Sequence, residues 1–330
     1  MMQRLYRWFD RNFLELGREM RLSYLPPLMV YMAAGVSGLT SLVGTFFVKE
    51  YLGLSAAFLA ALGFWAGIPW ALKMPIGHLV DLLWRWKAGL VYLGASLIAT
   101  SIGIMIGLIG SPDTMREVMS AEHWFVLAAL LSPIGYVMQD AVADAMTVEA
   151  VPRFEADGSP VPDDTRRLMN TTMQTLGRVA IIGGSVLVSL VNVVMFAGTE
   201  ALPQADKVAI YVDIYQMALV IPALSVAGVM WAGWLRRSKR RQLVRSGADA
   251  PTLRAFDNPG GETLAHPNWW ILGGSLVFVV ITVGVGLSGI DHGQEIIFVG
   301  SFAVIGFLMT RLLRELDAPA RNTLLGTAIV

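Results

Sequence analysis

The sequence predicts an all-α integral membrane protein, and three observations support that fold class. Of the 330 residues, 55% are hydrophobic and only 15% are charged, whereas soluble domains average about 25% charged residues. The mean hydropathy is +0.58. The apolar residues also form successive charge-free runs, each close to the roughly 20 residues that a membrane-crossing helix needs. Composition and pattern therefore favour a chain that crosses a bilayer repeatedly.

We expect one membrane-crossing helix from each of these runs. The predicted ranges are 25–48, 54–76, 88–109, 124–146, 169–196, 211–235, 269–290 and 296–313. A further apolar segment opens at Asn322 and reaches Val330, which is too short to span a bilayer, so the sequence is interpreted as cut off inside a ninth helix. The stretch 112–123 is expected to be a loop. Glycines at 35, 38, 63, 67, 103, 107, 183 and 184 are expected to mark close helix contacts or flexible points.

Composition divides the chain into four parts. Residues 1–24 alternate apolar and basic side chains, which is typical of an amphipathic helix on the cytoplasmic membrane surface and not of a cleaved signal peptide. Residues 25–235 hold an N-terminal six-helix transmembrane bundle, expected to consist of two inverted three-helix repeats. Residues 236–268 form a basic cytoplasmic linker with Gly and Pro, and 269–330 begin a C-terminal transmembrane bundle.

The distribution of Lys and Arg predicts a cytoplasmic N-terminus. Only Lys49, Arg116 and Lys207 would lie on the outer side, and Lys73 and Arg178 fall within helices; the other Lys and Arg residues would be cytoplasmic. Short cytoplasmic loops of membrane proteins carry such an excess of positive charge. The prediction is a multi-pass protein, of the cell (inner) membrane if bacterial, and a reporter at Gly158 that proved external would contradict it.

Two carboxylates, Asp140 and Asp144, follow a charge-free stretch of the fourth predicted helix. They are four residues apart and therefore share one helical face. A charge in hydrocarbon costs roughly 2.5–3.5 kcal/mol on insertion scales, so a chain that keeps two there normally uses them against internal cations or a transported solute. The alternative is that both lie near the cytoplasmic headgroups and only pack against neighbouring helix ends.

Two cations within helices are candidate partners for these carboxylates. Arg178 lies roughly 15 Å along the fifth helix and keeps its charge, so it needs a carboxylate or an anionic ligand. Gln174, one turn earlier, presents an amide on the same face. We expect Arg178 to hold the negative group of a solute or, in its absence, Asp140; a purely structural pair with Asp140 is the alternative. Lys73 either pairs with Asp144 to close the inner end or snorkels to the interface.

Asp140 is the candidate for proton or substrate coupling. Burial disfavours its charged form, whereas a nearby Arg178 would favour it. These opposing effects would let Asp140 exchange a proton as a cavity opens to either side. Asp144 lies one turn closer to the cytoplasm, where a gating role is expected.

The end of the second predicted helix carries a further pattern. The pattern is Gly77-x-Leu-x-Asp81, followed by Arg85 and Lys87 in a short cytoplasmic hairpin. It resembles the signature loop of the major facilitator superfamily, although Trp84 stands where a glycine is usual. In that superfamily the loop is a conformational latch, so the resemblance implies a gating role for Gly77, Asp81, Arg85 and Lys87. It also implies a major-facilitator-type helical bundle for the whole chain.

Two stretches resemble one family more closely. The first stretch is Pro69-Trp70-x-Leu-Lys73, followed by Gly77 and Asp81. The second is Gln139-Asp140-x-x-Ala-Asp144-Ala, followed by Glu149. Together they are similar to the folate–biopterin transporter family. The resemblance implies secondary active transport, usually proton-coupled, of an anionic organic solute such as a pterin or folate. The muropeptide permease and acetyl-coenzyme A transporter groups carry related patterns and imply a muropeptide or acyl-conjugate solute instead.

Other classes of function are less well supported by the residues. The sequence has no cysteine and four scattered histidines, so we expect no metal site and no cofactor, and it lacks the nucleophile–base motifs of an enzyme. The expected partners are a small-molecule solute, protons and membrane lipids, with the basic stretch after the sixth helix able to bind anionic lipid; no nucleic acid is expected. A non-transporting assembly or scaffold protein remains an alternative, which a solute-uptake assay would separate from a transporter.

Overall fold

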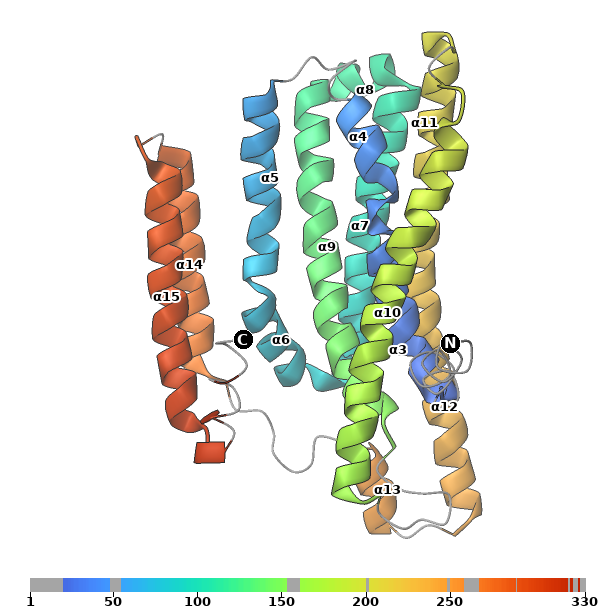
Figure 1. Cartoon of the computed structure of the whole chain (residues 1–330), viewed down its shortest axis with the longest axis vertical. Coiled ribbons are helices and arrows are strands. Elements are labelled where there is room, and N and C mark those ends of the chain that lie inside the picture. Colours follow the sequence, from blue (N-terminus) through green and yellow to red (C-terminus); the bar gives the residue numbers. More distant parts are fainter. Residues whose placement is uncertain are drawn as a thin grey trace, which may run out of the picture.

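The computed structural model describes residues 20–47, 55–152, 161–199, 202–247, 250–257, 267–288, 290–319, 321–322 and 326. Every regular element within them is helical (Figure 1). Among the described residues, 8 helical stretches are long and apolar enough to cross a membrane. An all-helical, multi-pass membrane chain is thereby confirmed. The amphipathic segment 1–19, the reporter position Gly158 and most of the stretch after Asn322 lie outside the described residues.

The eight stretches are assembled from the following elements. The turn η2 (Leu22–Tyr24) leads into the first, which joins α3 (Leu25–Val36), η3 (Ser37–Thr40) and α4 (Ser41–Phe47), and the second joins α5 (Ala56–Ala71) to α6 (Lys73–Leu82). After η5 (Trp84–Trp86) come α7 (Lys87–Gly110), α9 (Ala121–Ala150) and α10 (Asp163–Phe196). The sixth joins α11 (Gln204–Ala218) to α12 (Val220–Arg245), and the last two are α14 (Trp269–Ser288) and α15 (Gly293–Glu315). The short helices α8 (Pro112–Val118) and α13 (Ala250–Asp257) lie between them.

Two sequence predictions about loops are wrong. The stretch 112–123 contains the helix α8, which starts with Pro112 at its first position, where proline is well tolerated. The segment with Gly77 and Asp81, which was predicted to lie in a hairpin loop, belongs to α6, and this helix continues to Leu82. The connection to α7 is thus shorter than the predicted hairpin.

The second apolar stretch is broken between α5 and α6 at Leu72, whose φ of −89° and ψ of 8° are not helical. Pro75 accounts for this break. Its ring clashes with the carbonyl four residues earlier, and it has no N–H to donate to that carbonyl. The break makes Lys73 the first residue of α6.

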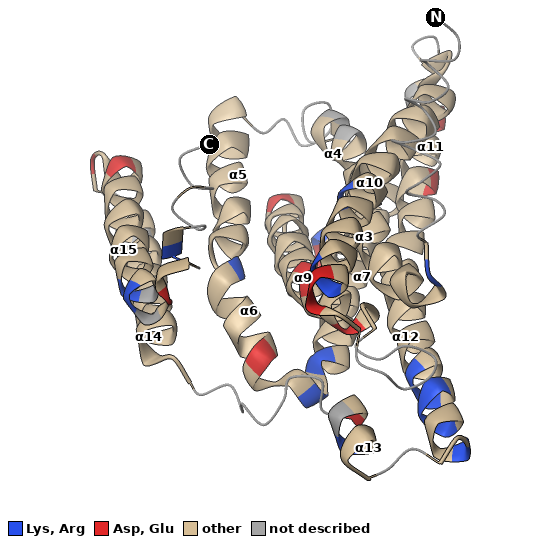
Figure 2. Cartoon of the chain, turned by 60° about the horizontal axis from the view of Figure 1, so that its bottom comes forward, with Lys and Arg blue, Asp and Glu red and all other residues tan. Residues whose placement is uncertain are grey.

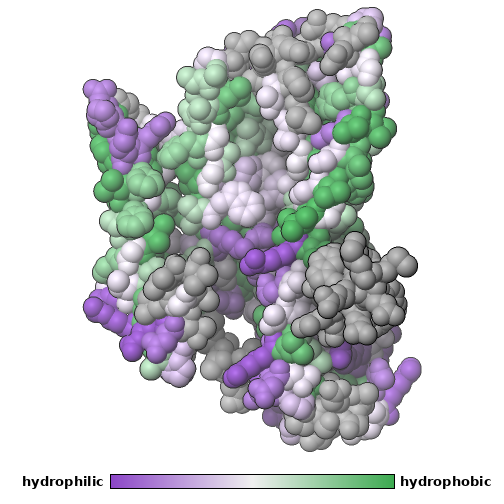
Figure 3. Space-filling view, in the orientation of Figure 1, coloured by the Kyte–Doolittle hydropathy of each residue, from purple (hydrophilic) through white to green (hydrophobic). Residues whose placement is uncertain are grey.

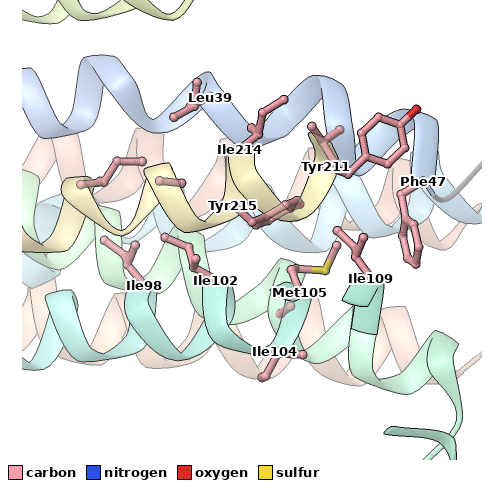
Figure 4. Packing of buried hydrophobic residues seen from close by; sticks show 14 of the residues in the cluster. Leu39, Phe47, Ile98, Ile102, Ile104, Met105, Ile109, Tyr211, Ile214 and Tyr215 are labelled. Carbon is pink, nitrogen blue, oxygen red and sulfur yellow. The ribbon is translucent and has the colours of Figure 1, made fainter. Parts of the chain in front are cut away.

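The apolar core lies between α7, α9, α11 and the first apolar stretch. Figure 4 shows Ile98, Ile102 and Met105 of α7 beside Ile214 and Tyr215 of α11. Their side chains are buried. This packing forms one end of the bundle, whereas the charged residues of α9 lie towards the other end.

Small residues allow two pairs of helices to approach closely. A Cβ atom on Gly94 of α7 would lie 2.7 Å from the carbonyl oxygen of Gly135 on α9, and one on Gly184 of α10 would lie 2.8 Å from the Cα of Gly35 on α3. The predicted contacts at positions 35 and 184 are therefore present. Around positions 63, 67, 103 and 183, no described atom lies within 4 Å of such a Cβ, so those glycines do not mark helix contacts here.

The pair α14–α15 stands beside α5 and α6, apart from the other helices (Figure 1). Its contacts with the second apolar stretch include a hydrogen bond from the backbone N–H of Asn268 to Nε2 of His78, 2.9 Å long. A side chain on Gly286 would collide with the Trp65 ring. The division into a complete N-terminal bundle and the start of a second bundle stays a prediction.

Candidate ion-pair site on the fourth long helix

Charged residues gather around α9 and near the ends of α6 and α12 (Figure 2). α9 carries three carboxylates in its C-terminal half, from Asp140, Asp144 and Glu149. At 1.5 Å per residue, they lie about 7, 13 and 20 Å from the middle of the helix. Since half the hydrocarbon core is about 15 Å thick, a centred α9 would hold the two aspartates in hydrocarbon and the glutamate among the headgroups.

Lys73 lies between the two aspartates. Its Nζ is 2.5 Å from Oδ2 of Asp140 and 3.1 Å from Oδ2 of Asp144. The Asp140 side chain is only 10% exposed, whereas Lys73 and Asp144 are 42% and 45% exposed. The Pro75 break makes Lys73 the N-terminal residue of α6, and α6 packs against α9. The site is therefore open on the side of Lys73 and Asp144 and closed around Asp140.

Tyr31 of α3 completes this cluster, and its role was not anticipated from the sequence. Its hydroxyl donates a hydrogen bond of 2.5 Å to Oδ1 of Asp144. The ring is buried and lies so close to Gly177 of α10 that a Cβ there would be 2.8 Å away. A buried tyrosine hydroxyl usually finds a partner, so a lone tyrosine in an otherwise apolar helix was the available signal. We call Tyr31, Lys73, Asp140 and Asp144 the central cluster.

The central cluster has an unbalanced charge. With the Tyr31 hydroxyl neutral and the other three groups ionised, one ammonium faces two carboxylates, so one negative charge has no cation among the cluster residues. Uncompensated charge is costly in a membrane interior. Binding of one cation, with a proton the smallest, would make the cluster neutral.

Arg178 and Gln174 do not join the central cluster directly. Within the part of the chain that the structure describes, Arg178 makes no ion pair or hydrogen bond, and its side chain is exposed near the middle of α10. The expected pair between Arg178 and Asp140 is not formed, and Lys73 pairs with Asp140 instead. Nε2 of Gln174 lies 3.4 Å from Oγ1 of Thr147, which donates to the Asp144 carbonyl. Gln174 thus contacts the Thr147 side chain of α9 and not the carboxylates of the cluster.

The exposed position of Arg178 has a consequence in a membrane. A charged side chain there must face the bundle interior or a water-filled cavity rather than lipid. Figure 3 shows a small patch of hydrophilic side chains at about mid-height on one face of the molecule, with more hydrophobic surface above it.

A second cluster lies at the end of α9, around Glu149. Nζ of Lys87 is 2.6 Å from Oε1 of Glu149 and 3.8 Å from the centre of the Trp84 ring, and Nη1 of Arg236 on α12 is 3.9 Å from the same oxygen. The Lys87 side chain is only 10% exposed. We call Trp84, Lys87, Glu149 and Arg236 the terminal cluster.

The other residues of the predicted gating loop are placed differently. Asp81 and Arg85 are exposed and, among the described residues, form no ion pair. A Cβ on Gly77 would meet no described atom within 4 Å, so Gly77 does not mediate a close helix contact. Of the four residues, Lys87 alone is held by an ion pair in the described part of the chain.

Gln139 fixes α9 against its neighbours and was not assigned a role from the sequence. It is buried, accepts a hydrogen bond of 2.8 Å from the hydroxyl of Ser225 on α12, and donates to the carbonyl of Val91 on α7 over 3.5 Å. Asp140 is the next residue. Gln139 therefore holds in place the turn of α9 that carries Asp140.

No group of three or more His, Cys, Asp or Glu side chains in the described residues could hold a metal ion. The arrangement is instead one of ion pairs between helices. Such pairs can form and break as helices move, and they can take up a proton or an anionic group.

Comparisons with known proteins give one informative similarity. No family model matches the chain, and no solved structure matches it. A segment of 149 residues, 44% of the chain, is 28% identical to the folate-biopterin transporter of Synechocystis sp. and spans 28% of the length of that protein. The similarity is to a transporter, in agreement with the expectation that the chain is not an enzyme. Together with the eight apolar helices, it supports a multi-pass membrane transporter in general.

Proposed function

We propose that the chain is a secondary active transporter of the major-facilitator type, which moves an anionic organic solute of the pterin or folate kind by alternating access with coupling to protons. It would lie in the cell membrane with its N-terminus in the cytoplasm. The observation that carries the proposal is Lys73, shared by Asp140 and Asp144 at membrane depth. The similarity to a folate-biopterin transporter supports the solute class.

The central cluster supplies a coupling step. A proton taken up by Asp140 would remove the uncompensated negative charge and weaken the hold of Asp140 on Lys73. Lys73 would then remain paired with Asp144 alone, whose side chain is more exposed than that of Asp140. Because Lys73 starts α6 after the helix break, loss of one ion pair would free α6 to tilt against α9.

Arg178 supplies the solute step. It carries a permanent positive charge, lies near the middle of α10 and has no ion-pair partner among the described residues. An anionic group of the solute would satisfy it. This assigns the anion to α10 and the proton to α9, on different helices, so that proton and solute can be bound together.

The test is transport by the full-length chain in lipid vesicles. We expect labelled folate or biopterin to accumulate when the outside is more acidic than the inside. Arg178→Gln should weaken binding of the solute, while Arg167→Gln, at an exposed position on the same helix, serves as the control. Equal binding by the two variants would contradict the role of Arg178.

The same assay separates the alternatives. Uptake of muropeptides or acyl conjugates instead of pterins would keep a transporter but change its solute. Absence of uptake for every solute, with a folded protein, would favour a scaffold. Uptake that is equal with and without a pH gradient would contradict proton coupling.

A further inference from the structure

The C-terminal part of α12 carries basic residues on two faces. On one face, Arg236 donates from Nη2 to the carbonyl of Asp257 at 2.6 Å, and Nε of Arg240 lies 3.1 Å from both carboxylate oxygens of Asp257. Asp257 ends the linker helix α13. These two arginines are therefore used to hold α13 against α12.

The other face has a row of arginines without such partners. Arg237, Arg241 and Arg245 are four residues apart, so they lie one above the other along one side of α12. All three are exposed, and within the described residues none of them makes an ion pair or hydrogen bond. We call these three residues the arginine row.

The arginine row continues a side of α12 that is suited to lipid. Met230 and Trp234 precede it at the same helical spacing, and both side chains are 63% exposed. An exposed methionine and tryptophan at the end of an apolar helix are suited to acyl chains and to the interface, respectively. A lipid lying along this side would meet apolar groups first and the arginines next.

The depth of the arginine row also fits phospholipid headgroups. At 1.5 Å per residue, Arg237 and Arg241 lie about 5 and 10 Å beyond Trp234, and Arg245 about 16 Å. The headgroup layer is about 5–8 Å thick on each side of the core. Arg237 therefore lies within the headgroup layer, and Arg241 and Arg245 lie about 2 and 8 Å beyond it, within about one Debye length, where anionic lipids still attract positive charge.

We propose that the arginine row, together with Met230 and Trp234, binds an anionic phospholipid of the cytoplasmic leaflet. The apolar residues would contact its acyl chains, and the guanidinium groups would bind its phosphate oxygens, which suit the planar fork of arginine. Arg236 and Arg240 take no part, because Asp257 already occupies them. This site is independent of the solute and proton site.

Native mass spectrometry of the full-length chain in detergent, titrated with phosphatidylglycerol or phosphatidylcholine, tests the proposal. The wild type should bind phosphatidylglycerol more tightly. The variant Arg237→Gln/Arg241→Gln/Arg245→Gln should lose roughly tenfold or more of that affinity, given the contribution of each arginine near an anionic surface. The control Arg166→Gln/Arg167→Gln/Arg314→Gln removes the same charge from α10 and α15 and should bind as the wild type does.

Three results would overturn the proposal: equal losses in both triple variants, equal binding of the two lipids, or competition by inorganic phosphate as strong as that by phosphatidylglycerol. The first would indicate a general positive field, the second an apolar contact only and the third a site for free phosphate. If the triple variant does not fold, Arg241→Gln alone should lower the affinity about fivefold, and an unchanged affinity there would overturn the site.

Discussion

The two charged clusters on α9 use similar residues in different ways. In the terminal cluster, Lys87 is only 10% exposed, and Glu149 is approached by a second cation, Arg236. In the central cluster, Lys73 is 42% exposed and must serve two carboxylates. The terminal cluster therefore has an excess of cations, and the central cluster has an excess of anions.

This difference indicates that the two clusters have different roles, one as a fixed contact and one as a movable contact. Separating a buried ion pair leaves a charge without compensation, which is costly, so Lys87 and Glu149 should hold α7 and α9 together in every state. Lys73 is 42% exposed, and a proton taken up by Asp140 would replace the lost cation, so Lys73 can leave that partner without a buried charge being left uncompensated. The comparison predicts a fixed contact at the end of α9 and a movable one in its middle.

Removal of the two lysines should give the largest contrast between the clusters. Lys87→Met leaves Glu149 with a distant Arg236 and should lower the free energy of unfolding by about 3 kcal/mol. Lys73→Met should lower it by less, because Lys73 and Asp144 are 42% and 45% exposed and a proton on the buried Asp140 can replace the lost cation. Unfolding of the purified variants in detergent, followed by circular dichroism, measures both; equal losses would contradict the division into fixed and movable contacts.

A smaller effect is expected for Tyr31. Tyr31→Phe keeps the ring against Gly177 but removes the hydrogen bond to Asp144, and hydrogen bonds to charged groups contribute about 1.5–3 kcal/mol. Because Asp144 is half-exposed, we expect a loss near the lower end of that range in the same unfolding measurement. Tyr92→Phe, at an exposed tyrosine of α7, is the control and should leave stability unchanged. A result for Tyr31→Phe equal to that control would remove Tyr31 from the central cluster.

The smallest effect is expected for Asp81, which is exposed and, among the described residues, forms no ion pair with either cluster. We predict that Asp81→Asn weakens transport by shifting the balance between inward- and outward-facing states, because it removes an exposed charge from the C-terminal end of α6. Since the chain has no cysteine, Ser189→Cys can report access to α10 in each state. Unchanged uptake and unchanged labelling of this cysteine, relative to Asp164→Asn, would rule out a latch role for Asp81.

Much of the fold could be predicted from the sequence because the length of an apolar run without charged residues can be counted directly along the chain. The eight apolar helices and the shared face of Asp140 and Asp144 follow from spacing alone. The break at Leu72 was missed, although Pro75 was visible, because a proline does not reveal whether a helix bends or stops. The helix ends were also underestimated, since α9 and α6 continue into polar residues that the search for charge-free runs left out.

The pairing of side chains from distant segments could be predicted only in part. Lys73 was expected near Asp144, but it also pairs with Asp140, for which Arg178 had been the expected partner. Tyr31 and Gln139 gave weak signals because a single polar group in an apolar helix can face several neighbours. The glycines show the same limit: positions 35 and 184 lie at a helix contact and positions 63 and 67 do not, although their spacing is no less suitable.

The central claim is that Asp140 exchanges the coupling proton, and one measurement tests it most directly. Asp140→Asn, Asp144→Asn and the wild type are placed in vesicles, and pH-driven accumulation of labelled solute is compared with exchange of solute at equal pH. We predict that Asp140→Asn abolishes accumulation but retains exchange, whereas Asp144→Asn slows both and still accumulates solute. Accumulation by Asp140→Asn at the level of the wild type would contradict the account and leave the central cluster a structural contact.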